Sequence, residues 1–169
     1  MKKSKSKIGL SSVSVTVCVL SVIAVLFSSC RNDIVYSHFS PVSYPDGTIT
    51  SSDKWHMDSA MRYDYTVTDA ESNYRMLIYV RHTERYPYQN MWLFVGDSLH
   101  QDTIEFYLAD DRGQWLGDRH YGFIEMPVLL EENYHFPDTG SYYMAIQHGM
   151  RDSVLRGVTD IGLEIKKNK

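Results

Sequence analysis

The sequence contains very little cysteine: two residues in 169, Cys18 and Cys30. No cysteine follows Cys30, so the rest of the chain has no disulfide framework and no thiol nucleophile. Such a domain has to be held together by its apolar core alone. The 140 residues that begin at Cys30 are enough for one domain, because a domain of ordinary size buries about two-thirds of the surface that its unfolded chain exposes.

Positive charge is also scarce beyond Cys30. All 21 acidic residues follow this position but only 13 of the 17 basic ones do, which gives this part of the chain a net charge of −8. Nucleic-acid binding and attachment to anionic lipid headgroups both rely on clustered lysine and arginine. The composition therefore argues against a nucleic-acid partner and against electrostatic membrane binding.

The sequence patterns of common enzymes are missing as well. There is no Gly-x-Ser-x-Gly elbow and no glycine-rich phosphate loop, and the seven histidines show no zinc-site spacing. Asp110–Asp111 and Glu131–Glu132 could serve as acid and base or bind calcium. The first pair, however, suits a turn, and the second suits a solvated strand end. We therefore expect a non-enzymatic protein that holds no metal and no other cofactor.

A three-part export signal opens the chain. Lysines at positions 2, 3, 5 and 7 precede an apolar stretch over residues 8–27, and Phe27-Ser28-Ser29-Cys30 follows. This ending is similar to a bacterial lipobox, in which the signal is cut before a cysteine that is then acylated. Residues 1–29 are thus predicted to be removed, and Cys30 to anchor the protein in a membrane. The alternative is an uncleaved membrane-spanning helix, for which twenty residues are long enough.

Alternation of apolar and polar residues dominates the rest of the chain, and helical periodicity is nearly absent. Turn signals such as Tyr44-Pro45-Asp46-Gly47 separate the alternating segments. We predict an all-β fold, a single antiparallel β-sandwich that is jelly-roll-like, with seven or eight short strands. The expected strands cover residues 34–39, 61–67, 74–83, 91–95, 103–109, 123–130, 141–147 and 158–165.

The same patterns predict the domain organisation and some local details. Residues 1–29 are the expected signal, residues 30–53 a lipidated tether with the first edge strand, and residues 54–169 the sandwich domain. The wholly apolar run at 91–95 suits a strand that is covered on both faces, or a central strand. Pro127 indicates an edge strand or a bulge. Residues 150–156 could form one short helix.

Aromatic residues provide a second functional hypothesis. Trp55, Trp92, Trp115, Tyr86 and Tyr88 could together form a platform that stacks on sugar rings. The alternative is a structural role, with Trp92 in the core and Trp115 closing one end of the sandwich. Exposure of two or more of these residues on one concave face would favour sugar binding, and burial of all five would exclude it.

Several short segments taken together carry a resemblance to one family. They include Arg81-His82-Thr83, Asn90-Met91-Trp92-Leu93-Phe94, Gly113-Gln114-Trp115-Leu116-Gly117, Gly149-Met150-Arg151-Asp152 and Gly157-Val158-Thr159-Asp160-Ile161-Gly162-Leu163. With the lipobox, their order resembles the gliding-motility lipoprotein H (GldH) family, from about Cys30 to Lys166. Within these segments we expect Gly149 to permit a turn, and Arg151 and Asp152 to pair across a loop.

The resemblance implies a small lipoprotein of the cell envelope that is associated with bacterial gliding over surfaces. We expect the lipid anchor to lie in the outer membrane. The resemblance places the chain beside other envelope lipoproteins and near a secretion system that exports gliding adhesins. Only Cys30 carries over as a functional residue. The first hypothesis is therefore an anchored interaction module of a motility or secretion apparatus. The second is a surface glycan-binding module, and the third is an enzyme whose site only the fold assembles.

Overall fold

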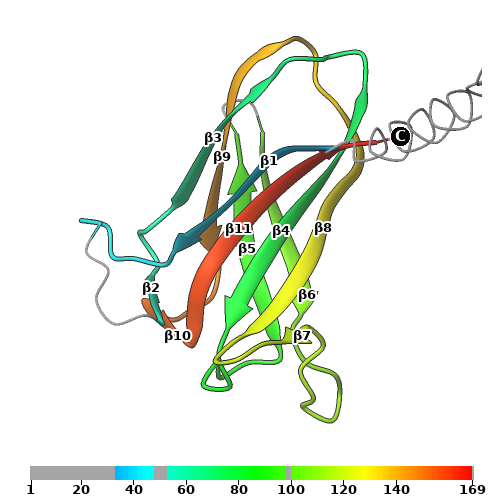
Figure 1. Ribbon diagram of the computed structural model, residues 1–169. Helices are drawn as coiled ribbons and strands as arrows, with labels where there is room; N and C mark the ends of the chain where they lie inside the picture. The colour runs from blue at the N-terminus through cyan, green and yellow to red at the C-terminus, as the bar shows by residue number, and fades with distance from the viewer. Residues whose placement is uncertain (1–32, 48–52, 98–99, 169) are drawn as a thin grey trace, which may run out of the picture. The chain divides into compact units, whose positions relative to one another are not determined.

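The computed structural model describes residues 33–47, 53–97 and 100–168 (Figure 1). These residues form strands, turns and loops and contain no helix; accordingly, no described segment is a helix able to span a bilayer. Cys30 and the predicted signal lie outside the described residues.

Eleven strands make up the described part of the chain and are all paired antiparallel. They are β1 (Ile34–Pro41), β2 (Lys54–His56), β3 (Met61–Val67), β4 (Asn73–His82), β5 (Asn90–Gly96), β6 (Gln101–Tyr107), β7 (Asp118–Arg119), β8 (Ile124–His135), β9 (Gly140–His148), β10 (Val154–Arg156) and β11 (Val158–Lys167). One sheet has the order β1-β11-β4-β8-β7 and a second has the order β3-β9-β5-β6, while β10 and β2 form a separate pair (Figure 1). The predicted all-β antiparallel sandwich is confirmed. The strand count is higher than expected because β2, β7 and β10 are only two or three residues long.

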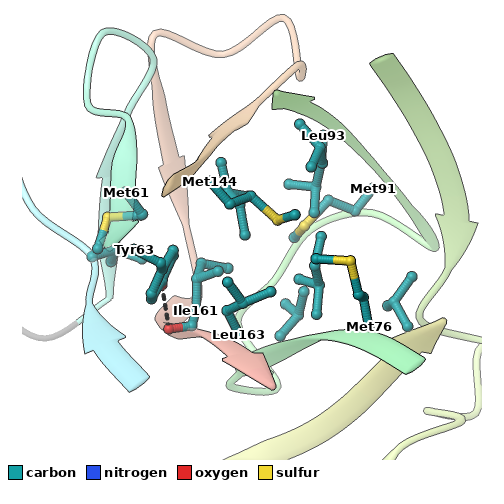
Figure 2. Packing of buried hydrophobic residues seen from close by; sticks show 14 of the residues in the cluster. Met61, Tyr63, Met76, Met91, Leu93, Met144, Ile161 and Leu163 are labelled. Atoms are coloured by element: carbon teal, nitrogen blue, oxygen red, sulfur yellow. Dashed lines mark hydrogen bonds between the residues drawn. The ribbon is translucent and has the colours of Figure 1, made fainter. Parts of the chain in front are cut away.

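The core lies between the two larger sheets and follows from the period of two along each strand. In β3 the side chains of Met61, Tyr63, Tyr65 and Val67 are all buried, and the residues between them are exposed. Figure 2 shows side chains from both sheets meeting in this space. The Tyr63 hydroxyl donates a 2.7 Å hydrogen bond to the carbonyl oxygen of Ile161, which ties β3 to β11 across the core. Burial raises the pKa of the Tyr63 phenol, so the proton needed for this bond is retained.

Strand β11 changes phase along its length, as its sequence suggested. Val158 is buried in one phase, and Ile161, Leu163 and Ile165 are buried in the other. The pairing of β11 with β4 shifts register between Val158 and Asp160. An extra residue in one strand of an antiparallel pair rotates the following side chains to the opposite face, which explains how both phases reach the core.

Two local predictions have opposite outcomes. Strand β7 pairs with β8 only at Ile124 and Glu125, so the next residues of β8, Pro127 included, form an edge within the described chain, as predicted. The helix expected at residues 150–156 is wrong, because Val154–Arg156 is strand β10 and pairs with β2. This pairing buries Leu155 against Trp55, a contact between segments about 100 residues apart that local periodicity cannot reveal.

Strand β5 is central in its sheet, as the apolar run suggested, but it is not covered on both faces. Met91, Leu93 and Val95 point into the core, whereas Trp92 and Phe94 each keep 38% of their surface exposed. The alternative that placed Trp92 in the core is therefore wrong. In a two-layer sandwich each sheet has one inner face only, so an uninterrupted apolar run must present alternate residues on the outside.

Candidate functional site

The outer face of the four-stranded sheet carries a group of exposed aromatic side chains. Trp92 and Phe94 come from β5, and Tyr107, which is 58% exposed, comes from the neighbouring strand β6. Trp92 is paired with Glu105, and Asn90 with Tyr107, so Trp92 and Tyr107 are diagonal neighbours on one surface. Tyr88, just before β5, is 37% exposed. We call Tyr88, Trp92, Phe94 and Tyr107 the aromatic face.

The loop after β9 packs against this face through Gly149. The Gly149 amide donates a 2.7 Å hydrogen bond to the carbonyl oxygen of Trp92. A Cβ atom at position 149 would lie 3.3 Å from Cβ of Trp92 and 3.2 Å from Cζ of Phe94. The glycine therefore serves close packing of the loop against two aromatic side chains. The turn that its sequence suggested is not what requires a glycine here, because φ of Gly149 is not positive.

A hollow of about 440 Å³ lies where this loop meets the aromatic face, and Trp92 is one of the residues that line it. Aromatic, sulfur-containing, amide and cationic groups all contribute to its wall, a mixture that suits a ligand with both apolar and polar surfaces. Its lining residues are Tyr88, Asn90, Trp92, Gly149, Met150 and Arg151.

Hydrogen bonds hold the rim of the hollow in place. The Tyr88 hydroxyl donates to Oδ2 of Asp152 over 2.9 Å, and this bond is the main reason why the pKa of Tyr88 is raised. The Asn90 amide donates to Oε1 of Glu105 over 2.6 Å. The expected pairing of Arg151 with Asp152 is not among the ion pairs of the described residues. Asp152 accepts from Tyr88 instead, and Arg151 lines the hollow.

The buried rings of His148 and Trp55 pack together at the start of the same loop. His148, the residue before Gly149, is buried, and its ring lies edge-on to the Trp55 indole at 5.2 Å between centroids. Nε2 of His148 is 3.2 Å from the carbonyl oxygen of Trp55. Burial lowers the pKa of His148, so the imidazole is neutral at pH 7. Strand β2 thereby positions the start of the loop that borders the hollow.

The five residues predicted as a sugar platform divide into two groups. Tyr88 and Trp92 are exposed and line the same hollow. Trp55 and Tyr86 are buried, and each donates a hydrogen bond to a main-chain carbonyl. Trp115 is partly buried and packs on the ring of His82 at 4.6 Å between centroids. Three of the five residues thus support the core.

Sequence reasoning missed Phe94 and Tyr107, although a signal for both was present. In the alternating segment at 103–109, Tyr107 shares its phase with Thr103 and Glu105 and opposes Ile104 and Phe106. That phase marks the solvent side of β6. Phe94 lies on the same side of β5 as Trp92, because side chains alternate along a strand. Its exposure could have been predicted if one face of the sheet had been known to be uncovered.

No three histidine, cysteine, aspartate or glutamate side chains come together as a possible metal site in residues 33–47, 53–97 and 100–168. The acidic pair at 110–111 behaves as its turn signal predicted, because Oδ1 of Asp110 accepts hydrogen bonds from the amides of Arg112 and Gln114. Glu132 forms an ion pair with Arg75 at 3.1 Å.

Comparison with known proteins connects this chain to one family. A family model described as GldH lipoprotein matches residues 43–165. The chain is 29% identical over 170 residues to the "Gliding motility lipoprotein GldH homolog" of Christiangramia forsetii, covering 94% of this chain and 98% of that protein. It is 26% identical over 161 residues to the "Gliding motility lipoprotein GldH" of Flavobacterium johnsoniae, covering 88% of this chain and 94% of that protein.

Solved structures show only a distant likeness. Protein lmo2446 of Listeria monocytogenes matches with a TM-score of 0.35 and 15% identity, over 79% of this chain and 11% of that one. PorU of Porphyromonas gingivalis matches with a TM-score of 0.36 and 5% identity, over 79% of this chain and 13% of that one. The chain thus spans a small part of either protein.

Proposed function

This chain belongs to the GldH lipoprotein family, and on that basis we propose that it is an anchored interaction module of a gliding-motility or secretion apparatus. In this proposal, acyl chains on Cys30 hold the protein in the outer membrane. The aromatic face then binds another protein of the apparatus, and the chain itself catalyses no reaction. The relatives named gliding motility lipoprotein GldH support the cellular setting.

The exposed aromatic face is the observation that carries the interaction role. Trp92, Phe94 and Tyr107 lie on neighbouring strands and keep more than a third of their surfaces in water. Tryptophan and tyrosine are enriched at the centres of protein interfaces, where single side chains often contribute about 2 kcal/mol or more to binding. A group of them on one sheet face is typical of a contact surface.

Lipid anchoring fits the charge of the chain. With a net charge of −8 beyond the signal, the domain is repelled by anionic headgroups and needs another means of attachment. A single acyl chain holds a protein only weakly, whereas two or more anchor it stably.

Site-specific photo-crosslinking in the native cell envelope tests the proposal. A photoreactive phenylalanine analogue is placed at Phe94 or at Tyr107, and a matched control carries it at Tyr121, a fully exposed tyrosine outside the aromatic face. We expect one discrete adduct from positions 94 and 107 that contains a second envelope protein, and none from position 121. Equal adduct patterns at all three positions, or none at 94 and 107, would refute the proposed contact surface.

Sugar binding is the second candidate, because Tyr88 and Trp92 line one hollow together with the polar side chains of Asn90 and Arg151. Sugar rings stack on exposed aromatic faces, and polar groups beside them select the hydroxyl pattern. Trp92 is more exposed than Trp55 or Trp115, so a stacked sugar should change the fluorescence of Trp92 above all. A glycan array probed with the mature protein and its Trp92→Ala variant decides the matter: binding lost in the variant supports this candidate, and binding by neither protein rejects it.

A further inference from the structure

A second hollow opens between the two large sheets, at a place where the four-stranded sheet is incomplete. Strand β5 ends at Gly96, which pairs with Ala145 of β9. Strand β9 continues to Gly140 and pairs there with β3 alone among the described strands. The main chain of residues 140–144 therefore lacks a described neighbouring strand on the β5 side.

The hollow measures about 340 Å³, and its floor belongs to the apolar core. Tyr65 and Met144 contribute from one sheet and Met76 from the other, and Figure 2 shows Met76 and Met144 reaching into the space between the sheets. Tyr65 and Met144 are each 7% exposed, whereas Leu93 and Ile146 in the same core are fully buried. The core side chains of Tyr65 and Met144 are thus partly exposed to solvent through this opening.

The rim of the hollow is acidic. Asp97, Asp102 and Glu131 all line it together with His100, whose amide donates a 2.8 Å hydrogen bond to Oδ1 of Asp97 and whose Nδ1 lies 3.8 Å from the same oxygen. None of its described lining residues is a lysine or an arginine. The neighbouring phenol of Tyr134 has a raised pKa, mainly because of burial and further because of the charges of Asp97 and Glu131. A negative rim around an apolar floor selects a ligand that is itself apolar and positively charged.

Two strand edges flank the entrance. In the described sheets β6 pairs only with β5, and β8 beyond Glu125 pairs only with β4. Edge strands present unpaired amide and carbonyl groups to solvent, and an extended peptide can pair with them by strand addition. The entrance therefore offers main-chain hydrogen bonding next to an apolar hollow.

We propose that this hollow binds an extended segment of a partner protein, which inserts apolar side chains between the sheets and places lysine or arginine against Asp97, Asp102 and Glu131. A lipid is the less suitable occupant, since an acidic rim repels a carboxylate or phosphate headgroup. The site involves residues other than the aromatic face, and it does not depend on what that face binds.

Selection from a displayed library of twelve-residue peptides tests the proposal on the mature protein. The library is depleted on a Leu130→Trp variant, in which a larger side chain fills the hollow from β8. Binding of selected peptides is then located by NMR of methionine methyl groups. Met76 and Met144 report on the hollow, and Met150 reports on the aromatic face.

We expect the selected peptides to alternate apolar residues with lysine or arginine and to shift the methyl signals of Met76 and Met144. Reversing one rim charge with Asp102→Lys should weaken their binding about tenfold. Asp111→Lys makes the same charge change in an exposed turn and should leave affinity unchanged. If Leu130→Trp does not fold, Glu131→Lys serves as the depletion variant instead, so that Asp102→Lys remains an independent test.

Three results would overturn the proposal. The first is that selection enriches no peptide over the depletion variant. The second is that the enriched peptides are acidic, or that they shift Met150 and leave Met76 and Met144 unchanged. The third is that decanoate shifts Met76 and Met144 while no peptide does, which would assign the hollow to an acyl chain.

Discussion

Replacing Leu93 by alanine should destabilise the fold strongly, whereas the same change at its neighbour Phe94 should affect partner binding more than stability. Leu93 is fully buried, and a leucine-to-alanine change in a core costs about 2–5 kcal/mol because of lost apolar contact and the cavity left behind. With no exposed surface, Leu93 belongs in the upper part of this range.

The cost at Phe94 is smaller because 38% of its side chain is already in water. A fully covered aromatic side chain buries about 150–250 Å². At about 25 cal/mol per Å² the covered part of Phe94 contributes about 2–4 kcal/mol. The denatured chain also buries some of this surface, and the alanine side chain still buries a small part of it. Both effects lower the cost of the substitution. We therefore expect Phe94→Ala to cost about 1–2 kcal/mol, and no core cavity forms.

Urea denaturation of the mature protein, followed by circular dichroism, measures both changes. With a slope of about 1–3 kcal/mol per molar urea, the midpoint should fall by about 2 M for Leu93→Ala and by less than about 1 M for Phe94→Ala. Crosslinking to the partner by the photoreactive analogue at position 107 should decrease when Phe94→Ala is also present. It should persist in the Leu93→Ala variant at a temperature where that variant is folded.

Equal losses of stability at the two positions would refute the reasoning, because the Phe94 ring would then be a structural element and not an exposed contact. A second contradictory result is full crosslinking in the Phe94→Ala background. That result would leave the orientation of β5 intact and show that the Phe94 ring contributes little to partner binding, although position 107 contacts the partner.

Other predictions concern the backbone, pH and the anchor. Gly157→Ala should destabilise the fold, because Gly157 has a φ of 85° and a Cβ there would lie 2.4 Å from the amide nitrogen of Tyr86. Thermal unfolding measures this effect. Gly47→Ala is the milder control, because Gly47 also has a positive φ but a Cβ there would meet open space. Burial lowers the pKa of His82 and of His148, so the unfolded chain binds these protons more readily. Stability present at neutral pH should therefore be lost as the pH falls below about 6.5, and urea midpoints measured from pH 7.5 to 5 should decrease less in a His82→Gln variant. Mass spectrometry should find an acylated Cys30 at the mature N-terminus, and Cys30→Ala should release the protein from the membrane fraction; an unmodified Met1 on a membrane-inserted chain would contradict the anchor.

The longer strands were predictable because each is specified by its own residues. Residues 61–67 alternate strictly, and β3 (Met61–Val67) has the predicted bounds. The expected strand at 74–83 is displaced by one residue at each end in β4 (Asn73–His82). Alternation records which side of a strand meets the core, and this information is local. The turn at Gly47 was visible for the same reason, with a φ of 77°.

The short strands and the candidate site were only partly predictable. Strands β2 and β10 have three residues each and exist because they pair with each other. In the aromatic set, the sequence supplied the residue types but not their orientation. Trp55 and Trp92 are equally apolar, yet one is buried by β10 and the other is left on the outside of its sheet.

By itself, the sequence determined the all-β fold and the family, and it predicted an export signal with a lipobox-like cysteine, because each depends on residue types in a fixed order. The tertiary structure alone decided which aromatic side chains reach solvent and where the apolar core opens. Those outcomes depend on which strands become neighbours and where each one ends. Strand β5 stops at Gly96 while β9 continues to Gly140, and this difference in length, set by pairing between distant segments, leaves an acidic-rimmed hollow beside the core.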